Sequence, residues 1–353
     1  MSFRVAVVGA TGAVGREMFK VLAERKFPVS ELVPFASGRS AGRVLPWNGR
    51  DWICRALAPG CFDGVDIAFF DASDAVSKEW VPQAAAAGAW VVDNSGHHRM
   101  DPDIPLVVPE VNGALALEKA KRGVRALPER ERIIAGPNCT TIQMVVALRP
   151  IRDRWGIKRL VISTYQAVSG AGTAAMDELT AQTSAVIAGR ASAPHTFAHQ
   201  IAFNCIPQIG GFKDDGYTSE EHKLMAETRK ILAMPNLKVT ATAIRVPTLA
   251  CHGESLNLET DRPCSPEDVR AALRGEPGIV VLDEPQRGIY PMGAPGAASS
   301  VEGAVGRDGV YVGRIRRDSS LENGLNLWVV SDNLRKGAAL NAVQVGELLV
   351  GRR

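Results

Sequence analysis

A cysteine that could act as a nucleophile stands in the stretch Ala-Gly-Pro-Asn-Cys-Thr-Thr, residues 135–141. Pro137 lies just before Cys139, and apolar residues at helical spacing follow at positions 142, 145 and 146. We therefore predict that Cys139 lies at a helix N-terminus, where the helix dipole and unpaired N–H groups stabilise a thiolate. The competing interpretation is a small core residue after a turn, because free cysteine is among the most buried residue types.

A run of glycines near the start of the chain indicates a nucleotide site. It has the form G-x-x-G-x-x-G over residues 9–15, directly after an apolar stretch and at the opening of a segment with helical periodicity. Such glycines let the backbone approach a pyrophosphate, and the helix N-terminus supplies N–H donors. The spacing differs from G-x-G-x-x-G, so a plain strand-to-helix turn is the alternative. The predicted cofactor contacts here are Gly9, Thr11, Gly12, Ala13 and Val14.

The stretch Phe-Ala-Ser-Gly-Arg-Ser-Ala-Gly-Arg, residues 35–43, distinguishes between two cofactors. An NAD site usually has an acidic residue after the second strand, which binds the ribose 2′-hydroxyl. This stretch has no carboxylate, whereas hydroxyls and a guanidinium suit a 2′-phosphate. We therefore predict NADP, bound by Ser37, Arg39 and Ser40. A solvated basic loop is the alternative.

Strand-like and helix-like segments alternate in the first third of the chain. The strand candidates are residues 3–9, 31–36, 65–70, 90–95 and 132–138, with helical patterns after residue 13 and over 78–89. The first candidate is almost continuously apolar, as expected for a strand covered on both faces. The alternation predicts an α/β domain with a Rossmann-type, doubly wound parallel sheet over residues 1–137.

The pattern changes after about residue 150. Longer strand candidates cover residues 157–170 and 237–247, and helix candidates cover 173–189 and 218–232. Fewer helices between longer strands predict an α+β domain with a mixed sheet over residues 138–332. A stretch rich in Gly and Pro over residues 288–300 predicts a long loop. Residues 333–353 predict a C-terminal helix that packs back on the first domain.

Composition excludes several classes of protein. The 353 residues carry a net charge of only +3, too small to favour nucleic acid or a membrane surface. No apolar run approaches the roughly 20 residues of a bilayer span, and no signal peptide is apparent, so we expect a cytoplasmic protein. None of the six cysteines forms a C-x-x-C pair, which favours reduced thiols. His195 and His199 lack the glutamate of a zincin motif, so no metal site is expected.

Several stretches together resemble the aspartate-semialdehyde dehydrogenase family. They include residues 5–15, 35–42, 93–112, 136–144, 165–172, 217–232, 244–255 and 327–344, and so extend over essentially the whole chain. The resemblance implies a catalytic and dimerisation domain like that of glyceraldehyde-3-phosphate dehydrogenase, in a homodimer or homotetramer. It also implies the NADP-dependent, reversible reductive dephosphorylation of 4-phospho-L-aspartate to L-aspartate 4-semialdehyde. That step feeds diaminopimelate and lysine, threonine and methionine biosynthesis.

The resemblance also implies roles for individual residues in the reaction. Cys139 matches the family nucleophile and His252 the acid/base, and imidazole suits proton transfer near neutral pH. Arg245 matches the arginine that binds the substrate carboxylate, with a strand ion pair as its alternative. The resemblance assigns the other contacts as follows: Glu220 to the substrate amino group, Lys223 and Arg99 to the phosphate, Gln166 to the substrate, and Ser169, Gly170 and Asn333 to the cofactor.

Spacing within the segment 218–223 suggests two different functions for its charged residues. Glu220 and Lys223 share a helix face at i, i+3, so a solvated charged face is the alternative to substrate binding. Thr218 and Glu221 have the spacing of a capping box, so we predict a structural role for Glu221.

The chain departs from the family pattern at two sites. Gly136 and Thr140 replace the usual Asn and Ser around the cysteine, and Cys251-His252-Gly253 replaces the frequent Gly-His-Ser. Three other interpretations stay open. N-acetyl-glutamyl-phosphate reductase shares the fold and the cysteine–histidine chemistry. A non-catalytic NADP-binding homologue would have no need of Cys139 and His252. Glyceraldehyde-3-phosphate dehydrogenase would leave Glu220 without an ammonium group to bind.

Overall fold

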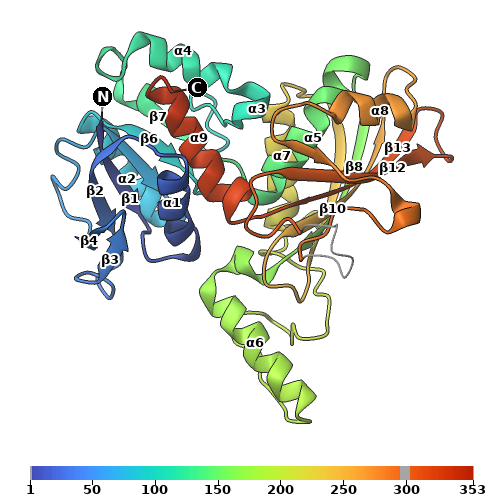
Figure 1. The fold of residues 1–353 in the computed structure, drawn as a ribbon, viewed down its shortest axis with the longest axis horizontal. Helices are drawn as coiled ribbons and strands as arrows, with labels where there is room; N and C mark the ends of the chain where they lie inside the picture. The colour runs from blue at the N-terminus through green and yellow to red at the C-terminus, as the bar shows by residue number, and fades with distance from the viewer. Residues whose placement is uncertain (1, 295–302, 353) are drawn as a thin grey trace. The chain divides into compact units, whose positions relative to one another are not determined.

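The chain divides into two compact units in a computed structural model that describes residues 2–294 and 303–352. Unit 1 comprises Met1–Asn138 and Ala338–Arg353, and unit 2 comprises Cys139–Gly337. The catalytic cysteine candidate is therefore the first residue of unit 2, and the end of the chain returns to unit 1. Figure 1 shows the elements of both units.

A five-stranded parallel sheet forms the centre of unit 1. Its order is β2-β1-β5-β6-β7, and all five strands correspond to the predicted ones. The strands are β1 (Phe3–Val8), β2 (Val29–Phe35), β5 (Ile67–Phe70), β6 (Trp90–Asp93) and β7 (Ile133–Ala135). The prediction of a Rossmann-type sheet is confirmed.

Apolar residues on both faces explain why this sheet is covered by helices on both sides. Successive side chains of a strand point to opposite faces. Val7 and Phe69 pack in one core with helices α1 (Ala13–Glu24) and α9 (Leu340–Leu349). Phe70, on the other face, packs against Phe62. Helix α2 (Asp74–Ala86) packs on β5 and β6.

Smaller elements complete unit 1. A hairpin of β3 (Val44–Trp47) and β4 (Arg50–Ile53) follows the predicted NADP loop and was not predicted. The remaining elements are α3 (Pro109–Asn112), α4 (Ala114–Arg122) and the 3₁₀ helices η1 (Val124–Ala126) and η2 (Glu129–Arg132). Helix α9 packs on α1, α4 and β6, so the C-terminal segment is part of the unit 1 core.

A six-stranded mixed sheet forms the centre of unit 2, and it confirms the predicted α+β architecture. Its order is β11-β12-β13-β10-β8-β9, with parallel pairs only at β11–β12 and β8–β9. The strands are β8 (Arg159–Gln166), β9 (Lys238–Arg245), β10 (His252–Glu259), β11 (Ile279–Val281), β12 (Val310–Asp318) and β13 (Gly324–Ser331). On β10, residues 252, 254, 256 and 258 are buried, which marks the face that packs against helices.

Three helices pack on this sheet: α5 (Cys139–Trp155), α7 (Ser219–Ile231) and α8 (Pro266–Leu273). Thr218 and Glu221 form the predicted capping box at the start of α7, which confirms the structural role of Glu221. Helix α6 (Thr173–Ile187) has a small apolar core of its own with Ile201 and Ile206. The short helices are η3 (Val168–Ala171), η4 (Pro285–Arg287) and the π-helical η5 (Arg335–Ala339).

Two further expectations concern the chain as a whole. All six cysteines are free thiols within the described ranges. Over the same ranges, no helix combines the length and apolar character needed to cross a bilayer. The predicted loop over residues 288–300 falls partly outside the described residues.

Candidate active site

The ends of four strands bring polar side chains to one edge of the mixed sheet in unit 2. Gln166 ends β8, Arg245 ends β9 and His252 begins β10. The register pairs Gln166 with both Arg245 and His252, and pairs His252 with Ser331 at the end of β13. Residues directly opposite one another project from the same face of a sheet. These four side chains therefore form one row on the face covered by α5.

The predicted nucleophile begins the helix that covers this row. Helix α5 starts at Cys139, as the sequence predicts, and the thiol is partly buried. Gly337 packs directly against it, because a Cβ at that position would lie 3.0 Å from the Cys139 Cβ. The dipole at the first turn of a helix favours negative charge, so this position suits a thiolate.

The histidine has one defined tautomer. His252 is 0% exposed, and its Nδ1 accepts the Ala167 N–H at 3.0 Å. A neutral imidazole that accepts at Nδ1 carries its proton on Nε2. Burial, followed by the nearby charge of Arg245, lowers the pKa of His252 to about 3. Nε2 has no hydrogen-bond partner in the described part of the chain. His252 is thus a neutral donor at physiological pH.

Arg245 lies close to both the nucleophile and a substrate-binding candidate. Burial lowers the pKa of its guanidinium, and the charges of Cys139 and Glu220 oppose that shift. The Ala167 carbonyl accepts from its Nη1 at 2.7 Å and so fixes the fork. A Cβ at Gly170 would lie 3.0 Å from this Nη1 and 3.3 Å from His252 Nε2, so only glycine leaves these groups room.

Glu220 links the strand ends to helix α7. It is buried, and its Oε1 accepts from Gln166 Nε2 at 3.2 Å. Gln166 Nε2 also lies 3.2 Å from Thr164 Oγ1. Lys223 Nζ lies 3.6 Å from Glu220 Oε2, although the lysine side chain is 43% exposed. Glu220 therefore belongs to the buried pocket, whereas Lys223 stands at its solvent edge.

Two predicted cofactor contacts of unit 2 hydrogen bond to each other. Ser169 Oγ lies 3.0 Å from Asn333 Nδ2, and Asn333 Oδ1 accepts the Cys251 N–H at 2.9 Å. Cys251 itself has φ 69°, a left-handed conformation that favours glycine. Burial raises the pKa of the Cys251 thiol far above its ordinary value, so the residue stays a thiol.

The glycine turn of unit 1 has the geometry of a phosphate cradle. Gly9 has φ 88°, and a Cβ there would lie 2.0 Å from the Asp71 carbonyl oxygen. A Cβ at Gly15 would lie 2.3 Å from the Gly9 carbonyl oxygen. Helix α1 begins after Gly12 without a side-chain cap or an acidic residue in its first turn. The predicted contacts Thr11, Ala13 and Val14 surround this uncapped N-terminus, so the turn fits a dinucleotide pyrophosphate.

The predicted 2′-phosphate loop follows β2 and is exposed. Backbone hydrogen bonds from Ser40 N–H and Ala41 N–H to the Ser37 carbonyl shape it, at 2.8 and 3.0 Å. The side chains of Ser37 and Arg39 are exposed, and Ser40 is half-buried. The loop thus presents hydroxyls and a guanidinium to solvent beside the carboxyl end of β2.

Arg99 has contacts that the sequence did not indicate. It is buried in unit 1, where its Nε donates to the Gly136 carbonyl at 2.9 Å and an Nη donates to the Asn94 carbonyl at 2.6 Å. Gly136 begins the turn that precedes Cys139. Arg99 therefore stabilises that turn through this hydrogen bond. This structural role is additional to its predicted role in phosphate binding.

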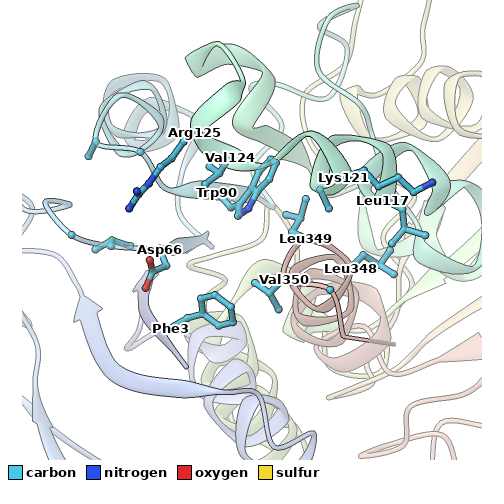
Figure 2. A pocket seen from close by; sticks show the side chains of 16 residues that line it. Phe3, Asp66, Trp90, Leu117, Lys121, Val124, Arg125, Leu348, Leu349 and Val350 are labelled. Carbon is cyan, nitrogen blue, oxygen red and sulfur yellow. The ribbon is translucent and has the colours of Figure 1, made fainter. Parts of the chain in front are cut away.

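Unit 1 contains a cavity of about 680 Å³, and Figure 2 shows the side chains that line it. Its lining includes Phe3 at the start of β1 and Trp90 at the start of β6, together with Leu348 and Val350 at the C-terminal end of α9. Ligands of doubly wound sheets bind at the carboxyl ends of the strands. This cavity is at the amino ends, so it is not the dinucleotide site.

Comparison with known proteins identifies the family. The model of the semialdehyde dehydrogenase NAD binding domain matches residues 4–120, and that of the dimerisation domain matches residues 148–336. The aspartate-semialdehyde dehydrogenase of Aquifex aeolicus is 52% identical, over 99% of this chain and 98% of that protein. The enzyme of Bacillus subtilis is 46% identical, over 98% and 96%.

The chain belongs to the aspartate-semialdehyde dehydrogenase family.

Solved structures agree with this assignment. Aspartate semialdehyde dehydrogenase II of Vibrio cholerae, complexed with ASA, has a TM-score of 0.89 at 46% identity and covers 99% of both chains. The Candida albicans enzyme with NADP has a TM-score of 0.74 at 28% identity, over 99% of this chain and 98% of that one. The chain is thus an oxidoreductase of amino-acid biosynthesis with a nicotinamide-binding domain.

Three residues of the site were missed from the sequence. Ala167 contributes only its backbone, and no side-chain pattern could have indicated its bonds to His252 and Arg245. For Gln143 and Glu254, the sequence did contain a signal in the spacing of polar residues. Gln143 is polar in a mostly apolar helix, four residues after Cys139, and Glu254 follows His252 by two on a strand. Both spacings place a side chain on the same face as a predicted catalytic group.

Proposed function

We propose that this enzyme converts 4-phospho-L-aspartate to L-aspartate 4-semialdehyde, reversibly and with NADP, through a thioester on Cys139. One observation carries the proposal: Gln166 is the register partner of both Arg245 and His252 and donates to Glu220, while Arg245 also lies within the electrostatic influence of Cys139. A nucleophile, an anion-binding fork and a buried carboxylate therefore share one pocket. An amino acid with a reactive carbonyl at the end of its side chain needs these three groups. The product would enter lysine, threonine and methionine biosynthesis.

The substrate's charged ends require separate partners. Arg245 would hold the α-carboxylate, because its planar fork binds carboxylates in bidentate fashion. Glu220 would accept from the ammonium group, and Gln166, already bonded to Glu220, would align it. Lys223 and Arg99 would bind the phosphate. The exposed ammonium of Lys223 suits a group that must leave to solvent.

The Cys139 thiolate would attack the acyl carbon, forming a C–S bond as inorganic phosphate leaves. The carbonyl oxygen gains negative charge in this step and again when the thioester is reduced. His252 would donate its Nε2 proton in a hydrogen bond to that oxygen, because its Nδ1 is occupied by the Ala167 N–H. Breaking the C–S bond then returns the thiolate and releases the semialdehyde.

Nicotinamide supplies the hydride that reduces the thioester. Gly9, Thr11, Gly12, Ala13 and Val14 would bind the pyrophosphate at the uncapped start of α1. Ser37, Arg39 and Ser40 would bind the 2′-phosphate, in a loop without a carboxylate. Ser169, Gly170 and Asn333 would contact the nicotinamide half. The solved relative from Candida albicans is described as a complex with NADP, which supports this choice.

A homodimer, alone or within a tetramer, is the assembly we propose. The family model over unit 2 describes a dimerisation domain. The outer face of the mixed sheet carries an apolar cavity of about 960 Å³ lined by Tyr165, Trp328 and Val330, among others. Light scattering of the purified protein tests the proposal, and a monomer at micromolar concentration would contradict it.

The test of the activity is NADP reduction with L-aspartate 4-semialdehyde and inorganic phosphate. We expect turnover that requires phosphate and is much slower with NAD. Parallel reactions with N-acetyl-L-glutamate 5-semialdehyde address the reductase alternative. Turnover of that substrate alone would overturn the substrate assignment, and turnover without phosphate would overturn the phosphorylating reaction.

A further inference from the structure

A buried carboxyl group lies beside the catalytic histidine and has no role in the steps above. Glu254 is 0% exposed on β10, two residues after His252 and on the same face of the sheet. Among the described residues, neither of its carboxyl oxygens meets a hydrogen-bond partner. A buried polar group without a partner costs free energy, so this arrangement calls for an explanation.

Gln143 connects this carboxyl to the two catalytic residues. It lies one helical turn after Cys139 on α5, and its Nε2 donates to the His252 carbonyl at 3.2 Å. Because a carbonyl only accepts, this bond fixes which end of the amide points to His252. The amide oxygen, Oε1, is buried and lacks a donor within the described ranges. The Gln143 amide also lies close enough to the Glu254 carboxyl to lower its pKa.

The surroundings of Glu254 favour the uncharged acid. Burial raises the pKa of its carboxyl well above the ordinary value, and only the Gln143 amide, a weaker influence, acts in the opposite direction. Transfer of an unpaired carboxylate into such a site is far more costly than transfer of the acid. The acid has one O–H donor and one carbonyl acceptor, whereas Gln143 offers Oε1 and a second N–H.

We propose that Glu254 is a positioning residue for His252, which as a carboxylic acid pairs with the Gln143 amide and holds it on the His252 carbonyl. The acid O–H donates to Gln143 Oε1, and the acid carbonyl accepts one Nε2 hydrogen. The other Nε2 hydrogen stays on His252. Both carboxyl oxygens of Glu254 and the amide oxygen of Gln143 then have hydrogen-bond partners.

This pairing ties the first turns of α5 to the start of β10. Cys139 stands at the start of that helix and His252 at the start of that strand, so the link sets the distance between nucleophile and donor. Small displacements of reacting groups, of about 1 Å, can lower rates by roughly 10²-fold. The inference rests on the proposed function, because it assigns the link a role in that reaction.

Three single variants and one double variant test the link. Glu254→Gln keeps one donor and one acceptor toward Gln143, and we expect kcat within about threefold of the parent enzyme. Glu254→Met and Gln143→Leu remove the pairing, and we expect kcat to fall about 10- to 100-fold with KM for the semialdehyde nearly unchanged. The double variant Glu254→Met/Gln143→Leu should be no worse than either single one. Ser255→Ala, on the opposite face of β10, is the matched control.

A second measurement does not depend on turnover. The infrared difference spectrum between the parent enzyme and Glu254→Gln at neutral pH should contain the carbonyl band of a protonated carboxylic acid. A carboxylate band instead would overturn the proposal, as would equal loss of kcat in Glu254→Gln and Glu254→Met, or full activity in Glu254→Met. If Glu254→Met fails to fold, the infrared band and Glu254→Gln still decide. Absence of turnover in the parent enzyme would refute the proposed function alone.

Discussion

The proposed catalytic pocket of unit 2 and the proposed cofactor loop of unit 1 differ in how their side chains are held. In the pocket, His252, Gln166, Arg245 and Glu220 are buried, and each has a hydrogen bond that sets its orientation. In the loop over residues 36–43, backbone bonds shape the turn while Ser37 and Arg39 remain exposed. The groups proposed to perform the chemistry are therefore oriented by buried hydrogen bonds, whereas two of those proposed to select the cofactor have side chains exposed to solvent.

This difference has an energetic consequence. Charges and donors in a buried site interact strongly, because little water screens them. An exposed guanidinium retains its water and is screened by salt, so its contact with an anion contributes little. Substitutions in the pocket should therefore have large effects on turnover, and substitutions in the loop should have small effects on selectivity.

The largest effect is expected at the nucleophile. Cys139→Ala should lower kcat by about 10³-fold or more, because the covalent step is lost. The measurement is the initial rate of NADP reduction at saturating substrate. Cys205→Ser, at an exposed cysteine of the same unit, serves as the control and should retain activity. An alanine variant with near-parental turnover would rule out the thioester.

The next effect separates the buried arginine from the exposed lysine. Arg245→Lys keeps the charge but loses the fork, so kcat/KM for the semialdehyde should fall about 10²-fold. Lys223→Ala should mainly raise the KM for phosphate, by a few-fold, because its side chain is 43% exposed. Initial rates against each substrate test both. Indistinguishable profiles for the two variants would show that the two anion sites are not separate.

A third effect concerns acid stability, which the pocket should control and the loop should not. The pKa of buried His252 is about 3, below the ordinary value of roughly 6.5 that an unfolded chain has. Between those values the unfolded chain binds the extra proton, so stability is lost as pH falls below about 6.5. At pH 5 the loss attributable to His252 should be about 2 kcal/mol, since each pH unit contributes about 1.4 kcal/mol.

Urea unfolding of the parent enzyme and His252→Gln at pH 7, 6 and 5 measures this loss. The difference between the two proteins isolates His252 from other groups. That subtraction matters because the raised pKa of Glu254 has the opposite sign and adds stability as pH falls. Parallel stability curves for the two proteins would mean that His252 is readily protonated in the folded state.

The smallest effect is expected in the loop. Arg39→Ala should lower the ratio of kcat/KM with NADP to that with NAD by about 3- to 10-fold, near 1 kcal/mol, because the contact is exposed. The control is Arg50→Ala on β4, an exposed arginine of the same unit outside the loop. An unchanged ratio would remove Arg39 from the 2′-phosphate site. A change above 10³-fold would mean that the loop is buried when cofactor binds.

Local patterns in the sequence predicted much of the fold. Continuous apolar runs such as residues 3–9 indicated buried parallel strands, and the cysteine's turn-then-periodicity pattern indicated the start of α5. These features depend on a few adjacent residues. The β3–β4 hairpin was missed although the sequence held a local signal for it. Asn48 and Gly49 form its two-residue turn, both with positive φ, and Asn-Gly is the pair that such turns favour.

The arrangement of the site residues could not be predicted from local sequence patterns. Nothing local to Gln166, Arg245 or His252 indicates that they are register partners, because register is set by pairing across the whole sheet. The family resemblance named these residues without indicating their bonds. The tautomer of His252 depends on a backbone N–H of Ala167, and the burial of Arg99 depends on two carbonyls. Hydrogen bonds to backbone groups cannot be predicted from residue identity, because nearly all residue types carry the same backbone groups.

The sheet register that brings the ends of β8, β9, β10 and β13 together also affects how unit 2 folds. Strands β8 and β9 pair in parallel although α6 and α7 lie between them in the chain. Contacts between segments distant in sequence form late, because a long loop must close first. After dilution from denaturant, the helical circular dichroism signal should therefore return before enzyme activity does. Catalysis would then serve as a reporter of the final stage of folding in unit 2.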